Sequence, residues 1–293
     1  MGGAADAGAL NVLYSSASGL EASPDVFFQG SGGVGGSLED GDRFGSAVAK
    51  GDFDGDGVFD LAVGAPGEDI GAAGNAGAVT VLYGSPARLT AAGSQTLFQG
   101  GGAGGAAETG DAFGSAVASG ILGGDGIADL VVGAPGENVG ATSNAGAVNL
   151  LAGSPGGLAA GAVATQGNPE PLDLFGAAVA TGDFDDTAGD DVVAGAPGET
   201  VNGRQLAGAV SVFNGPPGGL ANERLLFQGT AGLPGTPRAS TSSGPRWRRP
   251  TATASASGTW PSAPPARTSG RTPRPGRSTC WPGRRPARAA GPW

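Results

Sequence analysis

The stretch FGSAVAKGDFDGDGVFDLAVGAP, from Phe44 to Pro66, decides the fold. It opens with Phe-Gly and closes with Gly-Ala-Pro, and the same two landmarks recur twice further along the chain. The Gly of Gly-Ala-Pro follows the Phe by 20 residues in every copy (44 to 64, 113 to 133 and 175 to 195). The chain is therefore built from repeated units, whose period sets the architecture.

Each unit predicts four short strands. In the first unit they cover residues 44–50, 60–65, 77–83 and 95–99, and Pro66 ends the second of them. The first strand is expected to place Phe44 and Val48 on one face. Gly-rich loops separate the strands, and the sequence has no amphipathic helical stretch of useful length.

Four strands in a unit of about 40 to 70 residues are typical of a propeller blade, so the sequence predicts an all-β propeller. A β-solenoid is the structural alternative, although its repeats are usually shorter. We expect about three complete four-stranded blades, at residues 31–100, 101–167 and 168–233. Residues 1–30 are expected to be the last strands of a truncated blade, so that the propeller is incomplete.

Charge divides the chain at Pro234. The residues before it contain 26 acidic and 5 basic side chains, a charge of −21, whereas the residues from it onward contain 11 Arg and no acid. The acidic part has neither Cys nor His, which excludes a disulfide, a thiolate nucleophile, an imidazole base and an ordinary zinc site there. Its charge also argues against nucleic acid and anionic membranes as partners.

The first unit contains a row of alternating carboxylates, Asp52-Phe53-Asp54-Gly55-Asp56-Gly57-Val58-Phe59-Asp60. Calcium takes six to eight oxygen ligands, and carboxylates on a tightly turned loop can converge on one ion. The expected calcium ligands are the side chains of Asp52, Asp54, Asp56 and Asp60 and the carbonyl of Val58. The alternative is a solvated acidic turn between two strands.

The other two units differ in this loop. In the third unit the same register predicts calcium ligands at Asp183, Asp185, Thr187, the carbonyl of Gly189, and Asp191. In the second unit only Asp125 and Asp129 remain. A hairpin without metal is the favoured interpretation there, with these two residues as a weak candidate site.

The Phe-Gly pair, the aspartate loop and Asp-Leu-Ala-Val-Gly-Ala-Pro at residues 60–66 together resemble the FG-GAP repeat of the integrin α-subunit propeller and its bacterial relatives. The resemblance covers residues 42–229. It implies a seven-bladed propeller with calcium between the first two strands of certain blades. It also implies a non-enzymatic extracellular or cell-surface module for adhesion, with a protein or carbohydrate ligand. An accessory domain of a larger secreted enzyme is the alternative.

The two ends of the chain carry their own expectations. Met1 is expected to lie inside a blade, and the sequence shows neither a signal peptide nor a transmembrane segment. The segment 234–293 is rich in Arg and Pro, which predicts disorder. A basic arm that binds nucleic acid is the weaker interpretation of this segment.

A second hypothesis for residues 234–293 comes from the genetic code. Triplets made from the last base of one codon and the first two bases of the next allow DEFGAAVAT across residues 241–249, DLAVGAPGED across 259–268 and GAVDVLA across 275–281. The shifted Phe overlaps Ser243, and the shifted Gly-Ala-Pro begins at Ala263. Both positions follow the third unit's landmarks by 68 residues (175 to 243 and 195 to 263), which suggests a fourth blade translated in a shifted frame.

Overall fold

The computed structural model describes residues 3–185, 189–214, 220–230 and 232–239. All of them belong to one compact unit, Met1–Pro245. The predicted tail at 234–293 lies outside the described residues from residue 240 onward. The described part contains strands, turns and bends, and no helix in it could cross a lipid bilayer.

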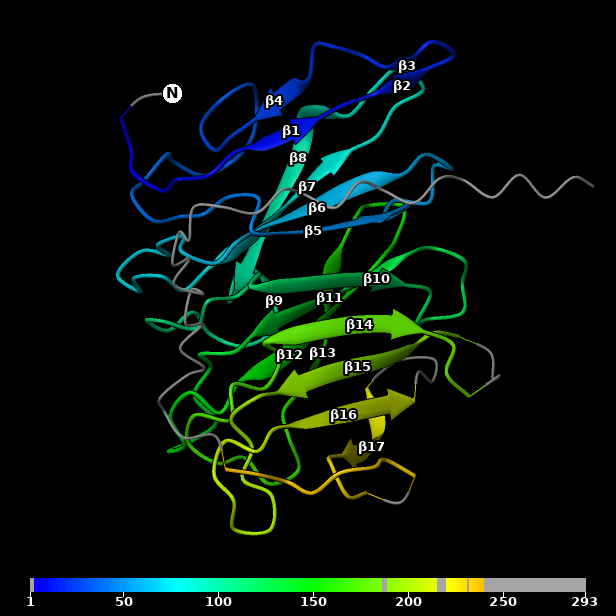
Figure 1. The fold of residues 1–293 in the computed structure, drawn as a ribbon. Helices are drawn as coiled ribbons and strands as arrows, with labels where there is room; N and C mark the ends of the chain where they lie inside the picture. The colour runs from blue at the N-terminus through cyan, green and yellow to red at the C-terminus, as the bar shows by residue number, and fades with distance from the viewer. Residues whose placement is uncertain (1–2, 186–188, 215–219, 231, 240–293) are drawn as a thin grey trace, which may run out of the picture. The chain divides into compact units, whose positions relative to one another are not determined.

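Three antiparallel sheets of four strands account for most of the described chain (Figure 1). In each sheet the strands pair in sequence order, so every connection is a hairpin. We call these sheets blades 1, 2 and 3. Their strands are β5 (Ala47–Gly51), β6 (Asp60–Ala65), β7 (Ala78–Tyr83) and β8 (Thr90–Gln99); β10 (Ala116–Gly120), β11 (Asp129–Ala134), β12 (Ala147–Ala152) and β13 (Ala159–Ala164); and β14 (Ala178–Gly182), β15 (Asp191–Ala196), β16 (Ala209–Asn214) and β17 (Ala221–Leu226).

Shorter strands complete the sheet structure. The N-terminal strands β1 (Leu10–Val12) and β4 (Asp25–Phe27) pair antiparallel, and β2 (Ser15–Ser16) pairs with β3 (Gly19–Leu20) in the hairpin between them. Strand β9 (Gly102–Ala103) adds in parallel to β8. The fold is therefore an incomplete β-propeller with three complete blades and a partial N-terminal one.

The first strand of blade 1 corrects the predicted strand at residues 44–50. Strand β5 begins at Ala47, because Arg43 has a left-handed backbone (φ 56°) and its carbonyl accepts a hydrogen bond from the Ser46 N–H at 3.0 Å. This turn breaks the alternation of faces. Phe44 is buried, whereas Val48 is 51% exposed, so the two do not share a face.

The Phe-Gly and Gly-Ala-Pro landmarks meet across neighbouring blades. The Phe113 N–H of blade 2 donates to the Ala76 carbonyl of blade 1 at 2.9 Å. A Cβ atom on Gly77 would lie 2.2 Å from the Phe113 carbonyl oxygen, and one on Gly64 would lie 2.1 Å from that of Gly114. Only glycine permits such close approach of two backbones.

Blades 2 and 3 repeat the contact in the same register. Phe175 N–H donates to the Ala145 carbonyl at 2.9 Å, and a Cβ on Gly133 would lie 2.0 Å from the Gly176 carbonyl oxygen. The recurring motif residues are thus those that join one blade to the next.

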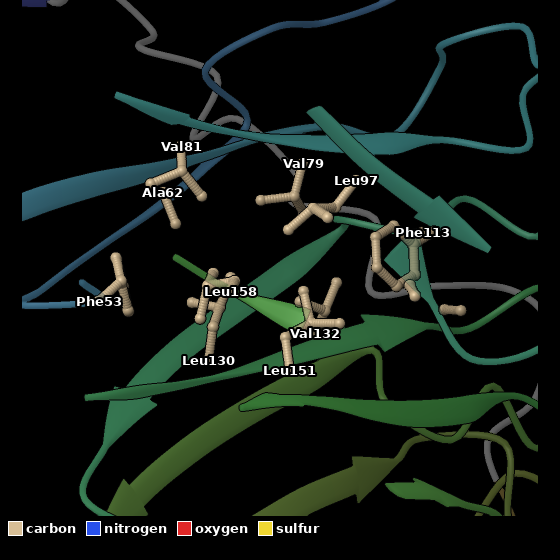
Figure 2. Close-up of a cluster of buried hydrophobic side chains, with 12 residues drawn as sticks. Phe53, Ala62, Val79, Val81, Leu97, Phe113, Leu130, Val132, Leu151 and Leu158 are labelled. Atoms are coloured by element: carbon tan, nitrogen blue, oxygen red, sulfur yellow. The ribbon is translucent and has the colours of Figure 1, made fainter. Parts of the chain in front are cut away.

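Apolar side chains fill the space between blades 1 and 2 (Figure 2). Val79, Val81 and Leu97 extend from blade 1 toward Leu130, Val132 and Leu151 of blade 2, and all six are at most 3% exposed. An equivalent cluster that includes Val148, Phe175 and Val192 lies between blades 2 and 3. Each core is shared by two neighbouring sheets, so adjacent blades stabilise one another.

Candidate metal centre

The predicted calcium loop of blade 1 connects β5 to β6. Gly55 and Gly57 have positive φ angles of 71° and 88°, which give the loop its tight turn. The loop is also held by its own carboxylates. Asp52 Oδ2 accepts from the Gly57 N–H at 2.9 Å, and Asp54 Oδ1 accepts from the Asp56 N–H at 3.2 Å.

Three of the predicted ligands come together. Asp52, Asp54 and Asp60 each contribute a carboxylate oxygen, and these oxygens lie within 4.8 Å of one another. Among the described residues, the buried Oδ1 of Asp52 has no hydrogen-bond partner. A buried carboxylate oxygen without a donor is costly, and a hard cation would satisfy it. The residues present therefore fit a calcium ion.

Asp60 also has a role that requires no ion. It is buried at the start of β6, where Oδ2 accepts from the Phe53 N–H and Oδ1 from the Gly84 N–H, both at 2.8 Å. These bonds tie both ends of the loop and the end of β7 to one carboxylate. Burial raises the pKa of Asp60 above its usual value, and the two N–H donors oppose that rise.

The two remaining predicted ligands of blade 1 lie outside this group of three. Asp56 is exposed, and its Oδ1 accepts from the N–H of Val58 at 2.7 Å. That bond shapes the turn just before β6. The structure thus gathers the first, second and last carboxylates of the row and places the middle one at the surface.

Blade 3 gathers the corresponding three carboxylates. Oxygens of Asp183, Asp185 and Asp191 lie within 4.8 Å of one another, and the Asn214 side-chain amide donates to Asp185 Oδ2. Gly189 has φ 106°, as a tight turn requires. The predicted ligand Thr187 lies outside the described residues.

The loop of blade 2 forms no group of three carboxylates. Asp125 Oδ1 accepts from the Ile127 N–H at 3.0 Å. Asp129 Oδ2 accepts from the N–H groups of Leu122 and Gly123 at 2.8 and 2.9 Å, and its Oδ1 accepts from that of Gly153 at 2.9 Å. Asp129 therefore repeats the backbone-binding role of Asp60 in a loop that lacks the other carboxylates.

A second set of repeated polar residues was not predicted. The side-chain amide of a Gln at the end of one blade donates to a buried Glu carboxylate that follows Gly-Ala-Pro-Gly in the next. The pairs are Gln29 with Glu68 (2.5 Å), Gln99 with Glu137 (2.5 Å) and Gln166 with Glu199 (2.8 Å). The recurrence of Gln-Gly and Gly-Glu in register with the other landmarks is the sequence signal that could have revealed them.

These Glu side chains are protonated far more readily than usual. Burial raises the pKa of Glu68 and of Glu137 to about 7, although the Gln hydrogen bond opposes the change. Burial raises the pKa of Glu199 as well. A neutral carboxyl between two blades avoids the cost of burying a charge.

Comparison with known families returns two matches to one repeat. The family model described as FG-GAP repeat matches residues 44–82 and 113–148. Each match starts at the Phe of a Phe-Gly pair. The first ends at Leu82 in β7 and the second at Val148 in β12, so both include the first three strands of a blade and the loop that carries the aspartates.

Proposed function

Since the chain is an FG-GAP repeat protein, and such repeats form propeller-type binding modules, we propose that it is a non-enzymatic, calcium-binding propeller module of the extracellular space or cell surface. We further propose that it serves adhesion by binding a protein or carbohydrate ligand. The calcium part of this proposal can be argued from individual residues.

The observation that carries the proposal is the grouping of Asp52, Asp54 and Asp60 around an unpartnered, buried oxygen of Asp52. Grouped carboxylates repel one another, and a bound calcium ion would supply the positive charge that offsets this repulsion. Asp56 and the Val58 carbonyl are proposed as further oxygen ligands of the same ion.

A second ion is proposed in blade 3. Asp183, Asp185 and Asp191 would hold it, with Thr187 and the Gly189 carbonyl as further ligands. Asp125 and Asp129 of blade 2 form only a weak candidate site, because one of them is occupied by three backbone donors.

Isothermal calorimetry on the calcium-free chain tests the proposal. We expect two binding events with dissociation constants near those of extracellular modules, about 10⁻⁴ to 10⁻³ M. Asp54→Asn should remove one event and Asp185→Asn the other. Asp125→Asn is the matched control, since it removes a loop carboxylate outside both groups.

Thermal unfolding supplies the second measurement. A ligand present at about 100 times its dissociation constant stabilises the folded state by about 2.7 kcal/mol per site. The melting temperature should therefore rise with calcium in the original chain and rise less in either Asp→Asn variant. Identical melts in calcium and in EDTA would contradict the calcium role.

A further inference from the structure

Blade 3 presents a surface that the preceding blades use for contact with their successors. Phe53 is fully buried and Leu122 is 5% exposed, whereas Phe184, at the same position in blade 3, is 57% exposed. Val79 and Val148 are likewise fully buried, whereas the equivalent Val210 is 38% exposed. The residues that bury their side chains against the next blade are present in blade 3 without such cover.

The backbone slots for the next blade are open as well. A Cβ on Gly64 or Gly133 would meet a carbonyl oxygen of the following Phe-Gly at 2.0 to 2.1 Å, but one on Gly195 would meet only the Ala178 Cβ, at 3.7 Å. At Gly208, which corresponds to Gly77 and Gly146, the nearest atom is the Pro197 carbonyl oxygen at 3.5 Å. The Phe carbonyl that blocks the other two positions is absent there.

An apolar groove marks this place. It has a volume of about 750 Å³, and its lining includes Gly195, Gly208, Val210, Leu226, Phe227 and Leu233. Gln228 lies at its edge and is exposed, whereas its counterparts Gln29, Gln99 and Gln166 are at most 5% exposed and each donates to a Glu of the next blade. The groove therefore combines a seat for an aromatic side chain with an amide that would pair with a carboxyl group.

The shifted reading frame supplies an occupant with matching chemistry. Every Thr codon begins with AC, so the triplet that overlaps it encodes Asp whenever its first base is G. Thr251, Thr253 and Thr259 follow Ser243, the position of the shifted Phe, by 8, 10 and 16 residues. These are the distances from Phe44 to Asp52, Asp54 and Asp60.

The same frame also places a carboxyl group for Gln228. The triplet that overlaps Arg267 can encode Glu, and it follows the shifted Phe by 24 residues, as Glu68 follows Phe44. We propose that the blade 3 groove is the docking site for the Phe-Gly strand of a fourth FG-GAP blade, and that this blade is encoded in the adjacent frame beneath residues 240–281.

The coding DNA gives the first test. The triplets over residues 240–281 should read as the repeat in the preceding frame, without stop codons. Stops in that frame, or codons for other residues at the Phe, Gly-Ala-Pro and Asp positions, would overturn the proposed occupant.

Docking is tested by restoring the frame with one nucleotide inserted in codons 234–239, which leaves the protein unchanged through Leu233. We expect amide exchange of residues 209–214 and 221–226 to slow by about tenfold or more, and the melting temperature to rise by about 5 °C. All measurements are made in EDTA, so that they stand independently of the proposed calcium binding.

Gly195→Leu provides the matched block. In the original chain this variant should leave exchange and melting unchanged, because a side chain at this position has room. In the frame-restored chain it should abolish the added protection. Equal effects in both backgrounds, or groove amides already protected in the original chain, would refute docking at this surface.

A synthetic peptide, DEFGAAVAT, covers the case in which the frame-restored chain does not fold. Added to the original 293-residue chain, it should slow exchange at residues 209–214, and it should fail to do so with Gly195→Leu. A peptide with Ala in place of Phe is the control, and equal effects of the two peptides would contradict the proposal.

Discussion

Replacing Glu68 with Gln should make the protein less sensitive to pH. Glu68 is 8% exposed and accepts a 2.5 Å hydrogen bond from Gln29 across the contact between the N-terminal partial blade and blade 1. Burial raises its pKa from a usual value of 4.5 to about 7, helped by the nearby charges of Asp42 and Glu39. The variant keeps an amide at this position and removes the titration.

The sign of the effect follows from proton binding. The folded state holds the Glu68 proton more tightly than the unfolded chain does, so its contribution to stability is fully present below pH 4.5. It is lost as the pH rises through about 7. One pKa unit corresponds to about 1.4 kcal/mol, so this shift gives an upper limit of roughly 3 kcal/mol between the two ends of the window.

Urea unfolding at pH 5 and pH 8 in EDTA measures this difference. Relative to the original chain, Glu68→Gln should be more stable at pH 8 than at pH 5, by about 1 to 3 kcal/mol. Glu39→Gln is the matched control, since it removes a neighbouring exposed charge and should shift the two values almost equally. Parallel pH profiles for the original chain and Glu68→Gln would refute a titrating carboxyl at the blade contact.

Three further predictions concern the packing of the blades. Phe113→Ala, at a fully buried position, should lower the free energy of unfolding by about 3 to 5 kcal/mol, whereas Phe184→Ala, at a position 57% exposed, should cost less than about 1 kcal/mol in the same urea titration. Gly133→Ala should cost at least about 2 kcal/mol because its Cβ would lie 2.0 Å from the Gly176 carbonyl oxygen, and Gly195→Ala should lie within about 0.5 kcal/mol of the original; equal melting temperatures for the two variants would contradict this. Asp129→Asn should cost about 1 to 3 kcal/mol, equally in calcium and in EDTA, because it turns an acceptor of backbone N–H groups into a donor; a calcium-dependent loss would instead place a metal ion at Asp129.

The order and type of the strands could be predicted because the period of the landmarks is regular. Strand β6 lies at Asp60–Ala65 as predicted, since Pro66 fixes its end. The start of β5 could not be predicted, because it depends on a left-handed turn at Arg43, a residue type with no preference for that conformation. Strand β8, at Thr90–Gln99, begins earlier than the predicted 95–99 because its pairing with β7 continues beyond an irregularity between Val81 and Tyr83.

The candidate metal centre was harder to predict than the fold. Alternation of carboxylates along a loop does not say which of them converge, and Asp56 and Asp60 are equivalent in the sequence pattern. The structure separates them, because Asp60 begins a buried strand and Asp56 lies at the exposed turn. A carboxylate that binds backbone N–H groups also has the same sequence signature as a metal ligand. Blade 2 distinguishes the two roles, because Asp129 keeps the backbone bonds where the other carboxylates are missing.

The proposed calcium loop and the contact between blades use alternate residues of one segment. Asp52 and Asp54 belong to the carboxylate group, while Phe53 between them is fully buried in the core shared with blade 2 (Figure 2). The backbone joins the same contact, since the Asp52 carbonyl accepts from the Ala128 N–H at 2.9 Å and the Phe53 carbonyl from the Ser154 N–H at 3.2 Å. Any ion that orders this loop would therefore also hold Phe53 and two interblade hydrogen bonds in place. In an assembly stabilised by contacts between nearest neighbours, that coupling makes metal binding a property of two blades.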